Sequence, residues 1–184
     1  AHSIVPVRAP TFCSGCPHAR STKVPEGSRA LAGIGCHSTA ILQDPVKTTT
    51  WSHMGGEGVL WVGQAPFTEE PHVFANIGDG TLFHSGFLAV RQAVATKVPM
   101  TYKVLWNGFV SMTGGQSVDG EATVPSILEQ FAAEGVKKMA VVTDEPLKYE
   151  GVKLPDGVPV HHRSELEAVQ IEFRKYPEVS VIVY

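Results

Sequence analysis

Two polar residues, Asp79 and Asn107, stand where predicted strands end, and side-chain oxygens of this kind can hold a divalent cation. Asp79 lies between Gly78 and Gly80, directly after the apolar run 73–77. The two glycines let the backbone turn sharply and approach a ligand closely. Asn107 ends the next predicted strand, 100–106. The sequence therefore predicts that both side chains belong to one site.

A helix is predicted to start at Thr81, because four apolar residues recur at helical spacing: Phe83, Phe87, Val90 and Val94. The free N–H groups and the positive dipole end of such a helix favour an anion. Asp79 is itself negative and would repel a bare phosphate. A diphosphate bound through Mg²⁺ is therefore the predicted ligand.

This G-D-G segment, followed by Asn at the end of the next strand, resembles the diphosphate motif of thiamine-diphosphate enzymes. The resemblance implies that Mg²⁺ is held by Asp79, Asn107 and the backbone oxygen of Phe109. Many of those enzymes have Asn-Asn where this chain has Asn107-Gly108, a departure that affects a neighbour and not a ligand. The simpler alternative is that G-D-G is an ordinary turn between a strand and a helix.

Three cysteines form the second chemical signal. Cys13 and Cys16 have the C-x-x-C spacing that lets two thiolates bind one metal centre, and Cys36 supplies a third. The residues leave several interpretations open: an iron–sulfur cluster, a zinc site completed by His18 or His37, a redox disulfide, or structural cysteines without a ligand.

Five ordered motifs resemble the thiamine-diphosphate domain of indolepyruvate:ferredoxin oxidoreductases, within the 2-oxoacid:ferredoxin oxidoreductase superfamily. They are F-C-S-G-C-P-H, G-I-G-C-H, T-W-S-H-M-G-G-E-G, G-D-G-T-L-F-H-S-G and M-T-G-G-Q-S-V-D-G. The resemblance covers nearly the whole chain. It implies a [4Fe–4S] cluster on Cys13, Cys16 and Cys36, with a fourth Cys after the last strand that these residues do not contain.

The resemblance also implies the residues that contact the cofactor: Gly35, His37, Gly78, Asp79, Gly80, Thr81, Asn107, Phe109, Ser111, Met112 and Thr113. His53 and Met112 are candidates for contacts with the reacting groups. The Glu that thiamine catalysis needs at the pyrimidine ring is expected from a separate pyrimidine-binding domain, and Glu57 is not predicted to take that role. Met112 stands where pyruvate-specific members tend to have Asn, which favours an aryl 2-oxoacid such as indolepyruvate.

The implied activity is oxidative decarboxylation of a 2-oxoacid, with electrons passed through the cluster to ferredoxin or a similar acceptor and the acyl group passed to coenzyme A. A non-oxidative thiamine-dependent decarboxylase or synthase is an alternative that has no use for the cysteines. A zinc-bound interaction module leaves Asp79 and Asn107 unexplained. A nicotinamide-binding domain would need G-x-G-x-x-G after its first strand, which is not found here.

The elements that must position these residues are those of an α/β fold. Thr123 is predicted to cap a helix, and Ser164 with Glu167 is predicted to form a capping box before another, whose apolar face is Leu166, Val169, Phe173 and Tyr176. Strands are predicted at 139–143 and 179–184, and 144–159 is a turn-rich connection that can include a small hairpin. The sequence thus predicts a doubly wound parallel sheet with helices on both faces, and ligands at the carboxyl ends of its strands.

The 184 residues are expected to form one thiamine-diphosphate-binding domain, with a Cys-rich loop at about 11–37, as a fragment of a larger chain or complex. A net charge of −3 without a basic run argues against a nucleic-acid surface, and no apolar stretch approaches the length of about 20 residues that spans a membrane. Three cysteines do not make a set of disulfides, so we expect a cytoplasmic protein. A dimer or larger complex is also expected.

Overall fold

The computed structural model describes residues 9–44 and 47–184. The described residues form a seven-stranded sheet in the order β2-β1-β3-β4-β9-β7-β8, in which every neighbouring pair is parallel. The strands are β1 Ala30–Ala32, β2 Thr48–Trp51, β3 Val73–Gly78, β4 Met100–Leu105, β7 Lys138–Thr143, β8 Val160–His162 and β9 Val179–Val183. The predicted parallel α/β fold is confirmed.

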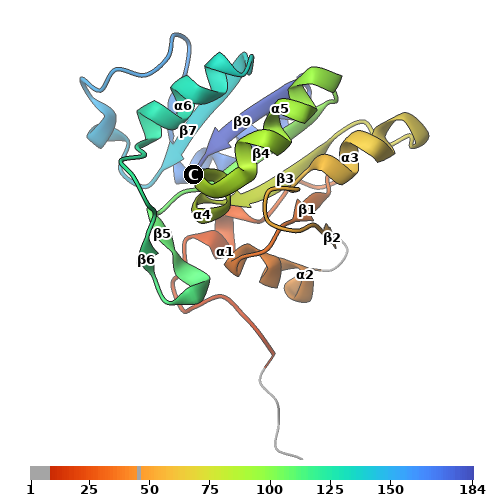
Figure 1. Ribbon diagram of the computed structural model, residues 1–184, viewed down its shortest axis with the longest axis horizontal. Helices are drawn as coiled ribbons and strands as arrows, with labels where there is room; N and C mark the ends of the chain where they lie inside the picture. The colour runs from red at the N-terminus through yellow and green to blue at the C-terminus, as the bar shows by residue number, and fades with distance from the viewer. Residues whose placement is uncertain (1–8, 45–46) are drawn as a thin grey trace, which may run out of the picture.

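The helices are α1 His18–Ser21, α2 Ala40–Gln43, α3 Val59–Gln64, α4 Asp79–Thr81, α5 Phe87–Thr96, α6 Val124–Ala133 and α7 Leu166–Phe173. Short 3₁₀ turns lie at Cys36–Thr39, Ala65–Phe67, Ser111–Thr113, Pro146–Tyr149 and Arg163–Glu165. A two-stranded antiparallel hairpin, β5 Phe109–Val110 with β6 Gln116–Ser117, lies beside α4 at one end of the sheet (Figure 1). Among the described helices, none combines the length and the apolar character needed to cross a bilayer.

The first face of the sheet is apolar. Helices α3, α5 and α6 lie side by side across it (Figure 1), and they bury the inward-facing residues of β3, β4, β7 and β9 in one continuous core. Its largest fully buried side chains include Trp61, Tyr102 and Phe131. We call this side the apolar face. The period-2 alternation along the strands puts Val73, Ala75 and Ile77 here and turns Phe74 and Asn76 to the other side.

The second face is covered by α1, the segment 21–24 and α7, and its buried layer is partly polar. Thr101 and Lys103 of β4 and Ser180 of β9 lie in it fully buried, between two small apolar clusters. His72 Nε2 and Thr101 Oγ1 are 2.9 Å apart, and Thr101 Oγ1 is 2.8 Å from Ser180 Oγ, so a chain of hydrogen bonds links the residue before β3 to β4 and β9. We call this side the polar face.

The helix after β3 starts earlier than predicted. It begins at Asp79, and α4 runs into α5 through a π-helical turn, Leu82–Gly86. A π turn inserts an extra residue and shifts the helical register. Phe83 consequently lies 47% exposed, whereas Val90 is buried as the periodicity predicts.

Three predictions in the C-terminal half are wrong. The box before α7 is formed by His162 and Glu165, not by Ser164 and Glu167: the His162 side chain accepts from Ser164 N, and Glu165 Oε1 accepts from His162 N. Residues 144–159 contain a 3₁₀ turn and no hairpin. Helix α7 ends at Phe173, so Tyr176 lies beyond it. By contrast, Thr123 caps α6 as predicted, in a box with Ser126.

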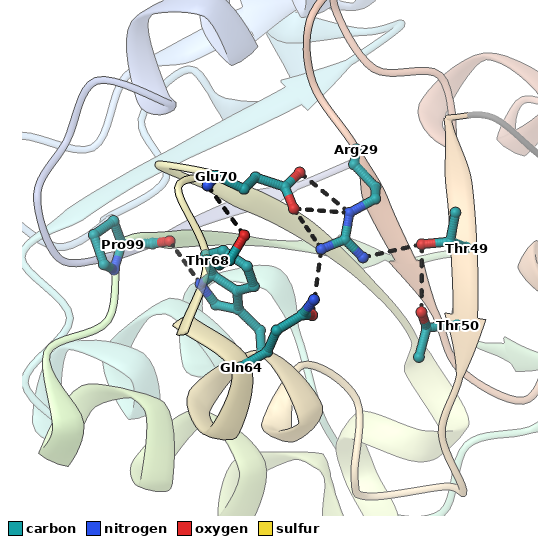
Figure 2. Close-up of polar contacts among 8 residues, drawn as sticks. Arg29, Thr49, Thr50, Gln64, Thr68, Glu70 and Pro99 are labelled. Atoms are coloured by element: carbon teal, nitrogen blue, oxygen red, sulfur yellow. Dashed lines mark hydrogen bonds and ion pairs between the residues drawn. The ribbon is translucent and has the colours of Figure 1, made fainter. Parts of the chain in front are cut away.

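A polar network fixes the amino end of β1. Arg29 Nε donates to both carboxylate oxygens of Glu70, at 3.1 and 3.0 Å, and its Nη1 donates to Thr49 Oγ1 at 3.0 Å (Figure 2). The guanidinium also lies 5.9 Å from the centre of the Trp61 ring, whose Nε1 donates to Pro99 O. The network joins β1, β2, α3 and the loop before β3. Because it lies at the amino ends of the strands, it supports the fold without reaching the opposite edge.

Candidate functional site

Asp79 connects the ends of β3 and β4. Its carboxylate is buried, with Oδ1 accepting from Gly80 N at 2.9 Å and Oδ2 accepting from the backbone N–H groups of Asn107 and Phe109, both at 3.1 Å. The parallel pairing of β3 with β4 brings Gly78 opposite Leu105, so the residues that follow each strand meet. The structure thus brings together Asp79, Asn107 and Phe109, as their positions after neighbouring strands predict.

The loop after β4 is held by its own short-range contacts. Asn107 Oδ1 accepts from Phe109 N at 2.9 Å, and Asn107 Nδ2 donates to Ser111 Oγ at 3.1 Å. The β5–β6 hairpin then closes around the 3₁₀ turn Ser111–Thr113. Thr113 Oγ1 donates to Gln116 Oε1 at 2.6 Å. The T-G-G-Q segment is therefore a folded lobe beside Asp79 and not a free loop.

One cavity of about 150 Å³ lies at this edge. All eleven residues predicted to contact the cofactor line it: Gly35, His37, Gly78, Asp79, Gly80, Thr81, Asn107, Phe109, Ser111, Met112 and Thr113. Cys36, predicted as a cluster ligand, lines it as well. The lining residues that sequence reasoning did not anticipate at this site are His18, Ile34, Met54, Leu105 and Val110.

Two buried histidines lie at the cavity wall with a nitrogen free. The Nε2 atoms of His18 and His37 have no hydrogen-bond partner among the described residues. Burial, with a smaller effect from His18, lowers the pKa of His37 to about 4, so its ring is neutral near pH 7. His37 also explains Gly35: at φ +155°, a Cβ there would lie 2.8 Å from the His37 ring. The neutral ring can donate or accept one hydrogen bond inside the cavity.

The three cysteines lie near one another and near Asp79. Burial raises the pKa of Cys36, and the neighbouring thiols of Cys16 and Cys13 raise it further, with a smaller effect from Asp79. Cys16 N donates to Cys13 O at 3.0 Å in a tight turn that has Gly15 at φ +76°. Cys36 opens the 3₁₀ turn Cys36–Thr39. Of the three predicted cluster ligands, Cys36 lines the cavity, whereas Cys16 lines a separate pocket beside α7.

Residues of the segment 53–58 differ in their placement. His53 is exposed and is not among the residues that line the cavity, whereas its neighbour Met54 is. Glu57 is buried against Gly33, where a Cβ would lie 2.3 Å from Glu57 Cγ. Its Oε2 accepts from Gly55 N at 2.8 Å, and burial raises its pKa to about 7. His53 had no distinguishing signal beyond the neighbouring glycines, and with Cys13 and Cys16 it is one of three predicted site residues that do not line the cavity.

Within residues 9–44 and 47–184, no three His, Cys, Asp or Glu side chains converge as the ligands of a single metal ion would. Cys13, Cys16 and Cys36, the predicted cluster ligands, therefore do not converge in this way. Two of the three ligands predicted for Mg²⁺ are of another kind, a side-chain amide and a backbone carbonyl.

Residues 33–182 match the family described as thiamine pyrophosphate enzyme, C-terminal TPP binding domain. The chain belongs to this family. The match runs from just after β1 to Ile182 in β9, and it therefore includes Asp79 and Asn107 at the carboxyl edge of the sheet. The C-x-x-C segment lies before it.

This TPP-binding domain is similar to part of a longer protein that is found in several organisms. It is 30% identical over 178 residues to "Indolepyruvate oxidoreductase subunit IorA" of Thermococcus kodakarensis, covering 82% of this chain and 27% of that protein. The subunit of the same name from Methanothermobacter thermautotrophicus is 30% identical over 193 residues, covering 94% of this chain and 30% of that protein. The chain thus spans less than a third of the length of these curated relatives.

Solved structures share the fold. The 2-oxoglutarate:ferredoxin oxidoreductase from Magnetococcus marinus, solved with 2-oxoglutarate, coenzyme A and succinyl-CoA bound, superposes with a TM-score of 0.68 at 19% identity, covering 98% of this chain and 64% of that one. Benzoylformate decarboxylase from Polynucleobacter necessarius gives 0.62 at 19% identity, covering 91% and 32%. Oxidative and non-oxidative enzymes therefore share this domain architecture, and the fold alone does not separate them.

Proposed function

We propose that this chain is the diphosphate-binding part of a thiamine-dependent 2-oxoacid:ferredoxin oxidoreductase that acts on an aryl 2-oxoacid such as indolepyruvate. The observation that carries this proposal is that Cys36 lies in the wall of the same cavity as Asp79 and Asn107. A redox group held by the cysteines would be adjacent to the cofactor. The 30% identity to indolepyruvate oxidoreductase subunits supports the same activity.

The residues at the edge of β3 and β4 suit Mg²⁺ and a diphosphate. The three proposed ligand atoms, Asp79 carboxylate, Asn107 Oδ1 and Phe109 O, are hard oxygen donors, which Mg²⁺ prefers. The carboxylate accepts three backbone N–H groups, and a carboxylate has about four lone-pair sites, so one remains for a cation. Gly78 has no neighbour within 4 Å of a Cβ position except the His37 ring, which leaves its backbone open to a ligand.

Thiamine diphosphate, when bound, would supply the carbon nucleophile for chemistry on a 2-oxoacid, and this chain would supply binding, orientation and charge. Asp79, Asn107 and Phe109 would hold the diphosphate through the metal, and neutral His37 would offer its free Nε2 to the bound cofactor. Cys13, Cys16 and Cys36 are soft sulfur ligands that suit a [4Fe–4S] cluster. The chain contains no fourth cysteine.

The remaining partners follow from the surface around the cavity. Four apolar side chains that line it are about half exposed: Ile34 at 46%, Met54 at 43%, Phe109 at 48% and Met112 at 50%. An exposed apolar rim of this kind favours contact with another domain. We propose that the pyrimidine-binding domain covers it and supplies the catalytic Glu, and that coenzyme A and ferredoxin meet the assembled enzyme in the cytoplasm.

Cys13→Ser in the intact enzyme tests the proposal. We expect thiamine diphosphate binding, measured by calorimetry, to remain, and ferredoxin reduction to be lost together with the iron and acid-labile sulfide. Ser14→Ala, in the same loop, is the matched control and should change neither. Full ferredoxin reduction in Cys13→Ser, or zinc in place of iron in the unmodified enzyme, would overturn the redox assignment.

Met112 lies in the 3₁₀ turn beside the cavity, where its flexible apolar side chain suits a large ring. We propose that Met112 contributes to preference for aryl pyruvates. One apolar contact is worth about 10- to 200-fold in discrimination, so Met112→Asn should reduce the kcat/KM ratio of indolepyruvate to pyruvate within that range. Leu147→Asn, an exposed apolar residue elsewhere, is the control. If pyruvate is already the best substrate of the unmodified enzyme, the size argument is wrong.

A further inference from the structure

Lys103 is a fully buried lysine on the polar face that the proposed chemistry does not use. It lies in the middle of β4 and is 1% exposed. Its Nζ donates to Ser21 O at 2.6 Å, to Lys23 O at 3.0 Å and to Gln170 Oε1 at 3.2 Å. An ammonium group has three donors, so this one is fully used.

The three acceptors join separate parts of the molecule. Ser21 O and Lys23 O belong to the segment that directly follows Cys16, since α1 runs from His18 to Ser21. Gln170 lies on α7, which covers the same face near the far edge of the sheet. Lys103 therefore attaches the end of the cysteine-bearing segment to the central strand β4, and braces it against α7.

Burying a lysine without a carboxylate partner reduces stability. None of the ion pairs among the described residues includes Lys103, and the centre of the Phe74 ring lies 5.4 Å from its Nζ. Burial without a carboxylate lowers the pKa of Lys103 to about 7. A methionine of similar length would fill the space without the desolvation penalty of a buried charge. We therefore attribute the role of the lysine to its hydrogen bonds with the backbone carbonyls.

The side-chain hydrogen bonds within α1 are local, while before the cysteines Thr11 Oγ1 accepts from Gln43 Nε2 of α2 at 3.0 Å. His18 Nδ1 lies 2.9 Å from Ser21 Oγ, and Thr22 Oγ1 donates to His18 O at 2.8 Å, so both contacts stay inside the segment. Helix α1 has only one turn and has no side-chain cap at its start. A one-turn helix is not stable by itself. Its position relative to the cavity therefore depends on contacts with the sheet, of which Lys103 supplies two.

We infer that Lys103 is a positioning residue that fixes the segment carrying Cys13 and Cys16 against β4, so that these cysteines stay beside Cys36. The part of this inference that concerns a bound cluster rests on the proposed function. The part that concerns the order of the segment does not.

The test is a graded series in the intact enzyme: Lys103→Met, Gln170→Leu and Gln170→Glu. Amide hydrogen exchange of residues 17–24 is the first readout. We expect at least about tenfold faster exchange in Lys103→Met, because each hydrogen bond from a charged donor contributes more than that factor. Gln170→Leu removes one of the three acceptors and should give a smaller increase. Gln170→Glu retains an acceptor for Lys103 and should leave exchange unchanged. Lys138→Met is the control, because Lys138 also lies over a ring on this face but binds only the Glu172 carboxylate.

The second readout is the iron content and the electron paramagnetic resonance spectrum of the reduced enzyme. Lys103→Met should lose iron or change the spectrum, while thiamine diphosphate affinity stays as in the unmodified enzyme. Unchanged exchange of residues 17–24 in folded Lys103→Met would overturn the inference. If Lys103→Met does not fold, unchanged exchange in Gln170→Leu would do the same. Absence of iron from the unmodified enzyme would instead refute the proposed cluster and leave the exchange result to decide the role of Lys103.

Discussion

The two faces of the central sheet differ in the chemistry of their buried layers. The apolar face joins α3, α5 and α6 to the strands through one continuous core. The polar face carries Asn76, Thr101 and Lys103 in its buried layer, beneath the cysteine-bearing segment and α7. Seven buried side-chain atoms in the described residues have no hydrogen-bond partner, and six of them belong to residues on the polar face or its edge: His18, His37, His72, Asn76 and Tyr184.

Unpartnered buried polar atoms reduce stability, each by about 1–3 kcal/mol, so their concentration on one face calls for a reason. His18 and His37 lie at the cavity wall, and Lys103 holds the segment that follows Cys16. We infer that the apolar face provides most of the stability, whereas the polar face gives up stability to position the site. Four predictions test this division.

The largest effect is expected at the edge of the polar face. Asp79→Ala removes a proposed Mg²⁺ ligand and should weaken thiamine diphosphate binding by more than about 100-fold, since even residues that only support a metal ligand cost about 10- to 100-fold. Asn107→Ala should act in the same direction. Calorimetry with the intact enzyme measures the affinity, and circular dichroism should show that both variants stay folded.

Asp156→Ala is the matched control for charge, because Asp156 is exposed in the connection before β8. It should bind thiamine diphosphate as the unmodified enzyme does. Unchanged affinity in both Asp79→Ala and Asn107→Ala would refute the proposed diphosphate site.

A substitution on the apolar face should lower the free energy of unfolding and leave thiamine diphosphate binding unchanged. Phe131 is fully buried on α6, with its ring centre 4.8 Å from that of Phe87. Phe131→Ala should lower the free energy of unfolding by about 3–5 kcal/mol, through lost burial and the cavity left behind. Chemical denaturation measures this, with Phe67→Ala, at an 88% exposed site, as the control. A loss below about 1 kcal/mol in Phe131→Ala would mean that α6 is not a principal part of the core.

Of the seven buried atoms of the described residues that have no hydrogen-bond partner, one does not belong to the polar face. It is Oε1 of Glu57. The pKa of Glu57 is raised from 4.5 to about 7, so between these pH values the folded state holds the proton more tightly than the unfolded chain. Its contribution to stability is therefore present below about pH 4.5 and is lost as the pH rises to 7, by about 3 kcal/mol. Glu57→Gln should be more stable than the unmodified protein at pH 8, and the difference should vanish near pH 4.

The stability contributed by the histidines of the polar face changes with pH in the opposite direction to that of Glu57. Burial lowers the pKa of His37 and of His72 to about 4, so each removes stability as the pH falls from 6.5 toward 4. The comparison of Glu57→Gln with Glu69→Gln, an exposed control, isolates the Glu57 contribution from theirs. A difference between Glu57→Gln and the unmodified protein that does not change with pH would contradict the raised pKa.

Sequence reasoning succeeded where the relation between residues is local or follows from strand order. Gly78, Asp79 and Gly80 follow an apolar run, and Asn107 follows the next, so parallel pairing alone places them together. It could not find the π turn that exposes Phe83, because the apolar spacing is the same in an ordinary helix. Strands as short as β1 and β8 carry too few residues to show a period. His18 reaches the cavity only through the packing of α1 on β4, which no local pattern encodes.

The smallest effect concerns two polar residues of the polar face that differ in their partners. Asn76 is fully buried, and neither its Nδ2 nor its Oδ1 has a partner among the described residues, whereas Thr101 lies between His72 and Ser180. Replacing an unpartnered amide with a hydrocarbon of similar size removes a desolvation cost, so Asn76→Leu should be neutral or up to about 1 kcal/mol more stable. Thr101→Val breaks the chain of hydrogen bonds and should lose about 1 kcal/mol. Denaturant unfolding of both variants measures the contrast. A loss of about 2 kcal/mol or more in Asn76→Leu would indicate that buried water satisfies the amide, and the polar face would then be less costly than its protein contacts suggest.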